Sequence, residues 1–220
     1  MSRAAELLNA AQAVLLDFDG PVTPLMPAPA NLEAADSARS PLRARGVILG
    51  SDIGTTSDHL AVLRWTAENA PEALPEVEKR CDEAEIASVR QAKPTRGAAE
   101  LLVACHRTGK PVVIVSNNTE RAIRAYLDRW LLSPYVTAVV GRPIGRPDLM
   151  KPNTHTVDQA LHLLGVDAEQ AVFIGDSVSD VEVSQRVGTR CIGYAKTPRR
   201  GTELRVAGAD AVTDDMSTFQ

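Results

Sequence analysis

Cysteine, aromatic side chains and excess positive charge are all scarce in this 220-residue chain. Its three cysteines are widely spaced and form no C-x-x-C pair, which excludes a disulfide framework and a cysteine zinc site. Aromatic residues make up only 4% of the chain, so the core is expected to be aliphatic. The formal net charge is −4, and without a basic excess nucleic acid is not expected as a partner.

The sequence also lacks a long apolar run. No segment approaches the roughly 18 consecutive apolar residues that a membrane span needs, so no membrane partner is expected. The N-terminal stretch MSRAAELLNAAQAVLLDFDG is interrupted by Glu6, Asn9 and Gln12, and it does not fit the pattern of a signal peptide. Together with the unpaired cysteines, these features predict a cytoplasmic protein.

What the chain does contain is a series of short apolar runs rich in Val and Ile. They lie at 13–20, 111–118, 136–142, 171–177, 190–196 and, more weakly, 210–215. Such runs are typical of strands that are buried on both faces, as in a parallel sheet. Helical patterns lie between them at 95–108, 119–131 and 154–164. The alternation predicts an α/β fold with a doubly wound, Rossmann-like parallel sheet.

The helical pattern at 119–131 is strongly amphipathic, and Thr119 is a suitable N-cap. Its apolar stripe consists of Ile123, Tyr126, Leu127, Trp130 and Leu131. Because these positions fall on one face of a helix, the whole stripe is predicted to pack in the core.

Residues 24–93 break the α/β alternation. They begin with the proline-rich segment PLMPAPA and continue with helical patterns at 57–70 and 76–90, preceded by a glycine-containing loop at 45–56. The alternation resumes after KPTRG at 93–97. The predicted organisation is an α/β core made of residues 1–23 and 94–220, with a small all-helical domain, residues 24–93, inserted after the first strand.

Polar side chains collect where the predicted strands end. They are Asp17 and Asp19 after the first strand, Ser116, Asn117 and Asn118 after the second, Asp176, Ser177 and Asp180 after the fourth, and Lys151 before the helix that leads into the fourth. Because open α/β sheets bind ligands at the carboxyl ends of their strands, these groups are expected to converge on one edge. Two acids as close as Asp17 and Asp19 repel each other unless a cation or a shared proton relieves them.

These segments resemble the four signatures of the haloacid dehalogenase superfamily, in its phosphatase branch with a helical cap inserted after the first strand. LLDFDGPVT is similar to the first signature and VIVSNN to the second, LMKPNTHTVDQALHLLGVD to the third, and AVFIGDSVSDVEVSQRVG to the fourth. The match is collinear over residues 13–216. The resemblance implies that residues 24–93 form the cap.

The resemblance further implies hydrolysis of a small phosphorylated metabolite with Mg²⁺ as cofactor. Asp17 would be the nucleophile that forms an aspartyl-phosphate, and Asp19 would protonate the leaving oxygen and then activate water. Lys151 would neutralise charge on Asp17 and on the phosphoryl oxygens. The implied phosphate-binding residues are Ser116, Asn117 through its backbone amide, and Gly20. The implied metal ligands are Asp17, Asp19 through its backbone carbonyl, Asp176, and Asp180 directly or through water.

Other activities on this scaffold differ by single residues. A dehalogenase or a phosphonate hydrolase would keep an acid like Asp17 but not one like Asp19. A phosphomutase would keep both, but such members usually carry a histidine soon after the first signature, and here the first histidine is His59. Phosphomutase therefore stays an alternative, as does a non-catalytic regulatory or binding protein that retains the fold.

The substrate is left open, because no recognisable pocket motif stands out in residues 24–93. The sequence contains two short basic runs. One consists of Arg39, Arg43 and Arg45 in the insertion, and the other of Arg199 and Arg200 near the C-terminus. We interpret them as solvated, with the alternative that the arginines of the insertion contact an anionic leaving group. His59, His106, His155 and His162 show no metal-ligand spacing.

Overall fold

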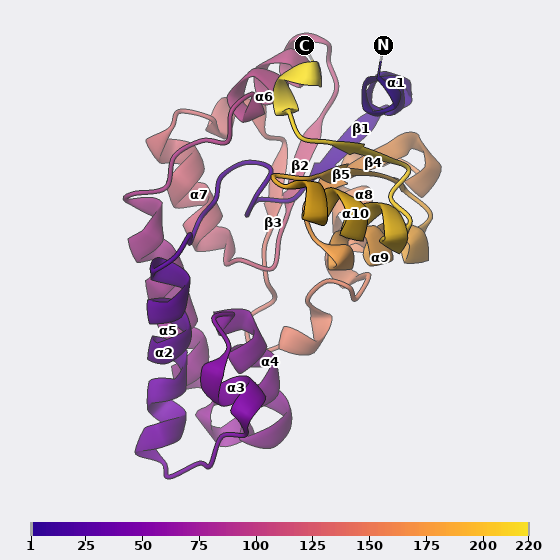
Figure 1. The fold of residues 1–220 in the computed structure, drawn as a ribbon. Helices are drawn as coiled ribbons and strands as arrows, with labels where there is room; N and C mark the ends of the chain where they lie inside the picture. The colour runs from indigo at the N-terminus through magenta and orange to yellow at the C-terminus, as the bar shows by residue number, and fades with distance from the viewer. Residues whose placement is uncertain (1, 220) are drawn as a thin grey trace.

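The computed structural model describes residues 2–219, in which six parallel strands form one sheet in the order β3-β2-β1-β4-β5-β6 (Figure 1). The strands are β1 (Ala13–Leu16), β2 (Val112–Val115), β3 (Ala138–Val140), β4 (Ala171–Gly175), β5 (Arg190–Tyr194) and β6 (Ala211–Thr213). The chain builds outward from β1 to β3, and then returns to the other side of β1 to add β4, β5 and β6. The predicted doubly wound parallel sheet is therefore confirmed.

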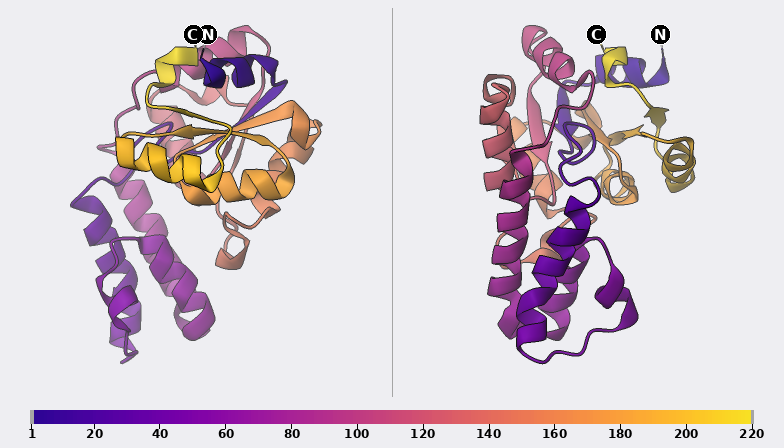
Figure 2. Two further views of the ribbon diagram at one scale, coloured as in Figure 1. Left: turned by 45° about the vertical axis from the view of Figure 1, so that its right-hand side comes forward. Right: turned by 60° about the vertical axis from the view of Figure 1, so that its left-hand side comes forward.

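Helices cover both faces of the sheet (Figure 2). One face carries α1 (Arg3–Ala10), α6 (Ala98–Arg107) and α7 (Glu120–Arg129), and the other carries α8 (His155–Leu164), α9 (Val178–Val187) and α10 (Pro198–Ala207). Successive strand residues point to opposite faces. Val14 and Leu16 of β1 accordingly pack with the first group of helices, whereas Leu15 packs with α8. A strand buried on both sides explains the unbroken apolar runs in the sequence.

Helix α7 is shorter than its apolar pattern suggests. It begins after Thr119, whose side chain caps it as predicted, and it ends at Arg129. The first three residues of the predicted stripe are buried, but Trp130 is 37% exposed and Leu131 is 78% exposed. Leu131 has a φ of 57°, which ends the helical path, so the prediction of a core position is wrong for the last two residues of the stripe.

Residues 30–89 form a helical bundle at one end of the molecule, below the sheet in Figure 1. It consists of α2 (Ala30–Ala44), α3 (Ser51–Thr55), α4 (His59–Asn69) and α5 (Leu74–Val89). The bundle has its own apolar cluster, in which Leu42, Leu63 and Val77 are fully buried. Single 3-10 turns lie at Pro71–Ala73, Ser133–Tyr135, Pro147–Leu149, Ala168–Gln170 and Met216–Phe219. None of the helices described combines the length and the apolar character that crossing a membrane requires.

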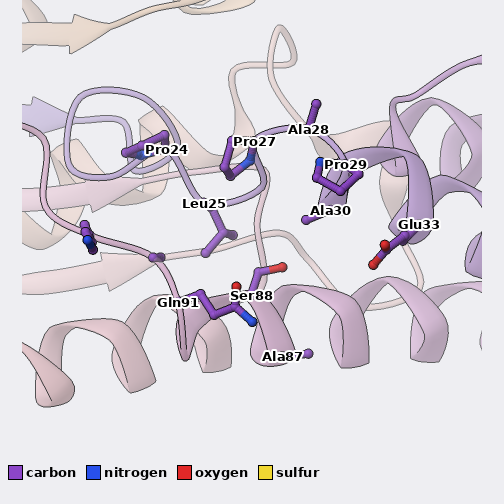
Figure 3. Close-up of a pocket in the computed structure, with 12 residues that line it drawn as sticks. Pro24, Leu25, Pro27, Ala28, Pro29, Ala30, Glu33, Ala87, Ser88 and Gln91 are labelled. Atoms are coloured by element: carbon purple, nitrogen blue, oxygen red, sulfur yellow. The ribbon is translucent and has the colours of Figure 1, made fainter.

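Two connections join the helical bundle to the α/β part. Residues 24–29 lead into α2, and residues 90–97 lead from α5 to α6. They are held together where they leave the sheet, because the Thr23 hydroxyl donates a hydrogen bond of 2.9 Å to the Lys93 carbonyl oxygen. A pocket of about 570 Å³ lies between them, with the proline-rich first connection facing the end of α5 (Figure 3).

Candidate active site

Three carboxylates and one lysine meet at the carboxyl end of the sheet, and we call them the acid cluster. Asp17 follows β1, Asp176 follows β4 and Asp180 lies in the first turn of α9, and each offers one carboxylate oxygen within 4.8 Å of the others. Lys151 Nζ donates to Asp17 Oδ1 at 2.9 Å, to Asp180 Oδ1 at 2.7 Å and to the Val115 carbonyl oxygen at 2.9 Å. Because an ammonium group has three N–H donors, all of them are used.

With all three acids ionised, the acid cluster would carry more negative charge than its one lysine can balance. Burial raises the pKa of Asp17 to about 7 despite the neighbouring Lys151. Burial, together with the charges of Asp17 and Asp180, raises the pKa of Asp176 to about 8. Burial alone would lower the pKa of Lys151, but its two carboxylate partners raise it. Hard carboxylate oxygens in excess of the available positive charge fit a divalent cation such as Mg²⁺.

Glycines allow these acids to come close to the backbone. A Cβ at Gly20 would lie 2.2 Å from Asp176 Oδ2, and one at Gly175 would lie 2.5 Å from Asp180 Cγ. Gly20 also has a φ of +116°, which side chains rarely allow. Its N–H donates to the Thr23 carbonyl oxygen at 2.7 Å. The observed role of Gly20 is thus to admit Asp176, and its contact with a phosphate stays a prediction.

Asp19 lies two residues beyond Asp17 and outside the acid cluster. Its Oδ1 accepts a hydrogen bond of 2.9 Å from the N–H of Leu25, in the first connection to the helical bundle. Burial raises the pKa of Asp19 above its ordinary value, although this hydrogen bond acts against the shift. A raised pKa favours the protonated form, which is the form a general acid needs.

The residues after β2 hold the lysine in place. Asn117 Oδ1 accepts from the Lys151 N–H at 2.8 Å, and Asn117 Nδ2 donates to the Lys151 carbonyl oxygen at 3.1 Å. The Ser116 hydroxyl pairs with Asn118, donating to its Oδ1 at 3.2 Å and accepting from its N–H at 3.3 Å. Among residues 2–219, no protein oxygen accepts from the backbone N–H of Asn117, so this donor is available to a ligand.

A cavity of about 740 Å³ lies over these groups, between the sheet and the helical bundle. The polar residues that the sequence places at this edge and that line the cavity are Asp17, Asp19, Ser116, Asn117, Asn118, Lys151, Asp176 and Ser177. Asp180 is fully buried beneath them. The cavity is also lined by residues to which the sequence analysis gave no site role. They are Met26, Asn31, Ser57, Asp58, His59, Leu60, Arg64, Pro152, Ser179 and Arg200. The helical bundle, and above all the start of α4, therefore forms the wall facing the acids.

The basic run of the insertion lies elsewhere. Arg39 is only 5% exposed, and its guanidinium donates to the carbonyl oxygens of Ile53, at 2.7 Å, and Thr56. The interpretation of Arg39 as solvated is therefore wrong, because it fastens the α3 segment to α2. Arg43 and Arg45 form ion pairs with acidic side chains at the surface of the bundle.

A second buried charge group, which we call the Glu85 cluster, joins the helical bundle to the α/β part. Glu85 Oε1 lies 3.0 Å from His59 Nε2 and accepts from Arg142 Nη1 at 2.9 Å, while Oε2 accepts from the Thr119 N–H at 2.6 Å. Burial alone would raise the pKa of Glu85, but the hydrogen bond with His59 and the charge of Arg142 lower it to about 2. This carboxylate is ionised and has partners on both oxygens, as expected of a structural contact.

The fold and the acid cluster together define a hydrolase of the haloacid dehalogenase type. Residues 47–194 match the family model described as haloacid dehalogenase-like hydrolase, and the chain belongs to this family. The sequence is similar to a phosphoglycolate phosphatase of Caulobacter vibrioides, with 28% identity over 216 residues that cover 93% of this chain and 87% of that protein.

A phosphoglycolate phosphatase of Pseudomonas fluorescens is 26% identical over 120 residues. That match covers 54% of this chain and 43% of the relative, so the chain spans less than half the length of this relative. Among solved structures, CbbY from Rhodobacter sphaeroides in complex with phosphate has a TM-score of 0.70 at 19% identity, and covers 94% of this chain and 95% of its own. A predicted phosphatase from Clostridium acetobutylicum also gives a TM-score of 0.70 at 19% identity, over 94% of each chain. These two structures share the fold.

Proposed function

We propose that the chain is a Mg²⁺-dependent phosphatase that hydrolyses a small phosphate monoester through an aspartyl-phosphate. The observation that supports this most strongly is the acid cluster, in which Asp17 and Asp176 line the cavity and Asp180 lies buried beneath them, with Lys151 bound to Asp17 and Asp180. Within this proposal, residues 1–23 and 94–220 form the catalytic core and residues 24–93 form the cap. The names of the relatives and the membership of a hydrolase family agree with it.

The metal would be held by the carboxylates of Asp17 and Asp176 and by the backbone carbonyl of Asp19, with Asp180 acting directly or through water. Mg²⁺ would supply the positive charge that lets a carboxylate approach a phosphate dianion. Asp180 already shares one oxygen with Lys151, and its other oxygen accepts from the Ser177 N–H and hydroxyl. This favours a supporting position for Asp180 beneath the metal.

The reaction would proceed in two steps. An oxygen of Asp17 attacks phosphorus, the bond from phosphorus to the leaving oxygen breaks, and Asp19 gives its proton to that oxygen. Asp19, now ionised, takes a proton from water as the water attacks the phosphorus of the aspartyl-phosphate, which releases inorganic phosphate and restores Asp17. Ser116 and the free N–H of Asn117 would hold the phosphoryl oxygens, and Lys151 would offset their charge through space.

The test is hydrolysis of p-nitrophenyl phosphate and of a panel of phosphorylated metabolites by the purified chain with MgCl₂. We expect phosphate release with Mg²⁺ and none after chelation with EDTA, with recovery when Mg²⁺ is restored. Activity that survives chelation would overturn the metal-assisted mechanism. A chain inactive towards every substrate would instead favour a binding protein that retains the fold.

A further inference from the structure

Three basic side chains, Arg64, Lys151 and Arg200, line the cavity over the acid cluster, and they differ in the partners that they have. Lys151 is committed to two carboxylates, and Arg200 forms an ion pair of 3.1 Å with Glu203. Arg64 forms no ion pair with any acid in the described part of the chain, residues 2–219. Its one hydrogen bond runs from Nη2 to the carbonyl oxygen of Lys151 at 3.3 Å.

This leaves Arg64 with unused capacity for a ligand. A guanidinium group has five N–H donors, and this one uses a single, long hydrogen bond. Burial lowers the pKa of Arg64, and the nearby charge of Arg142 acts in the same direction while Asp58 opposes it. Asp58 acts on Arg64 through space but forms no ion pair with it in residues 2–219, so the N–H groups of the guanidinium are free to bind an anion in the cavity.

The position of Arg64 fixes which part of a substrate it could reach. It contacts the backbone of Lys151, while the ammonium of the same lysine contacts Asp17. Arg64 is therefore about one lysine side chain away from the nucleophile, on the wall that the helical bundle provides. A group bound there belongs to the leaving alcohol of a small molecule and not to the phosphate being transferred.

We propose that Arg64 is a specificity-determining residue that binds a second anionic group of the substrate, so that the enzyme prefers phosphate monoesters whose leaving alcohol carries a carboxylate or another phosphate. The inference rests on the proposed phosphatase function. The sequence leaves open that arginines of the basic run near Arg39 contact an anionic leaving group. In the structure, Arg64 of helix α4 is the arginine placed to do so. A planar guanidinium binds both kinds of anion through paired hydrogen bonds.

A purely structural reading makes a different prediction. If the contact between Arg64 and Lys151 only braced the helical bundle against the site, its loss would slow hydrolysis of every substrate by the same factor. A specificity role changes the ratio between an anionic substrate and its neutral counterpart. The two readings are separated by paired substrates that differ in one group.

The experiment measures kcat/KM for two pairs, with MgCl₂ present. One pair is phosphoglycolate and 2-hydroxyethyl phosphate, and the other is propane-1,3-diol bisphosphate and 3-hydroxypropyl phosphate. The wild type is expected to prefer the anionic member of at least one pair, and the pair with the larger preference identifies carboxylate or phosphate. In Arg64→Gln that preference falls about 10- to 100-fold, the factor that corresponds to one hydrogen bond to a charged group. Arg64→Lys keeps part of it, and the exposed control Arg124→Gln keeps all of it.

A readout independent of turnover is calorimetric binding of the same compounds to Asp17→Asn and to Asp17→Asn/Arg64→Gln. Tighter binding of the anionic member, lost in the double variant, supports the inference even if hydrolysis is not observed. The inference is overturned if the wild type has the same kcat/KM for both members of each pair. It is also overturned if the ratio of the two kcat/KM values is unchanged in Arg64→Gln. Failure of the proposed function is distinguishable, because then p-nitrophenyl phosphate is not hydrolysed at all.

Discussion

The two buried charge clusters of this molecule differ in their balance. In the acid cluster, one lysine binds two of the three carboxylates, and burial raises the pKa of Asp17 and Asp176. In the Glu85 cluster, a single carboxylate has partners on both oxygens, and its pKa is lowered. Within residues 2–219 the Glu85 carboxylate has all its partners in the protein, although Arg142 Nε and Nη2 have no hydrogen-bond partner. The acid cluster instead offers carboxylate oxygens that fit a divalent cation. A buried charge alone therefore does not identify a functional site. More informative is whether the buried acids have enough positive partners in the protein to balance them when ionised.

The largest effect is expected from the acid cluster at Asp17. Asp17→Asn removes the proposed nucleophile, and we expect kcat to fall by more than about 10⁴-fold, together with loss of beryllofluoride labelling. Asp19→Asn is the matched comparison. It should still form the phospho-enzyme but release it slowly, because the base for the second step is missing, with a loss of about 10²- to 10⁴-fold. A fully active Asp17→Asn enzyme would contradict the assignment of the nucleophile.

Breaking the Glu85 cluster should affect stability first. Glu85→Gln leaves the buried Arg142 with only its longer ion pair of 3.8 Å to Glu78, and a loss of about 3 kcal/mol in the free energy of unfolding is expected. Because the folded-state pKa of about 2 lies below the ordinary 4.5, ionised Glu85 stabilises the fold above pH 4.5, and this contribution disappears as the pH falls towards 2. The difference between wild type and variant should therefore shrink in that window.

Urea denaturation between pH 7 and pH 3 measures this difference. Glu120→Gln is the control, because it removes an exposed glutamate with a surface ion pair, and it should change the unfolding free energy little at any pH. A difference between wild type and Glu85→Gln that stays constant across the pH range would show that packing, and not charge, is what Glu85 contributes.

Magnesium should act on the first cluster and leave the second untouched. At about 100 times its dissociation constant, a ligand of the folded state stabilises it by about 2.7 kcal/mol, so MgCl₂ should raise the melting temperature of the wild type. Asp176→Asn removes one of the proposed metal ligands and should lose most of this shift in melting temperature, whereas Glu85→Gln should keep the shift although it starts from a lower melting temperature. Equal shifts in wild type and Asp176→Asn would place the cation elsewhere.

The smallest effect concerns the backbone that lets the acids approach. Gly20→Ala places a Cβ against the Asp176 carboxylate and forces an alanine to a φ of +116°, for a cost of about 1–3 kcal/mol. Gly46→Ala is the matched control, because Gly46 also has a positive φ, +71°, but open space around it. Thermal unfolding should show the larger loss in Gly20→Ala, and a smaller magnesium shift as well. Equal losses would mean that conformational strain alone matters at Gly20.

Much of the fold was predictable because hydrophobic runs and strand ends are local features of the sequence. The strands lie within the predicted runs, and the topology brings Asp17, Lys151 and Asp176 together as expected. The end of α7 was not predictable from periodicity, since a φ of 57° at Leu131 does not depend on which face is apolar. A hydrophobic pattern describes which residues can be buried, but not where the chain turns.

The bundle side of the site was not predictable for a different reason. His59, Glu85 and Arg142 come from three distant segments without a shared motif, and only the folded chain brings them together. Arg64 is the single arginine of α4 and one of many arginines in the chain. Nothing in the sequence distinguishes it from Arg39 on α2. What distinguishes the two is whether a protein acceptor or an open cavity faces the guanidinium.

The three N–H donors of the Lys151 ammonium are all used by acceptors within the protein. A phosphoryl oxygen that takes a hydrogen bond from this ammonium must displace an existing acceptor. Two of them are fixed, since the Val115 carbonyl belongs to the sheet and Asp180 is held by the capping box of α9. The exchangeable acceptor is Asp17. Arrival of a phosphate at the lysine would then release Asp17 Oδ1, so that the lysine would exchange one anionic partner for another without leaving its place in the site.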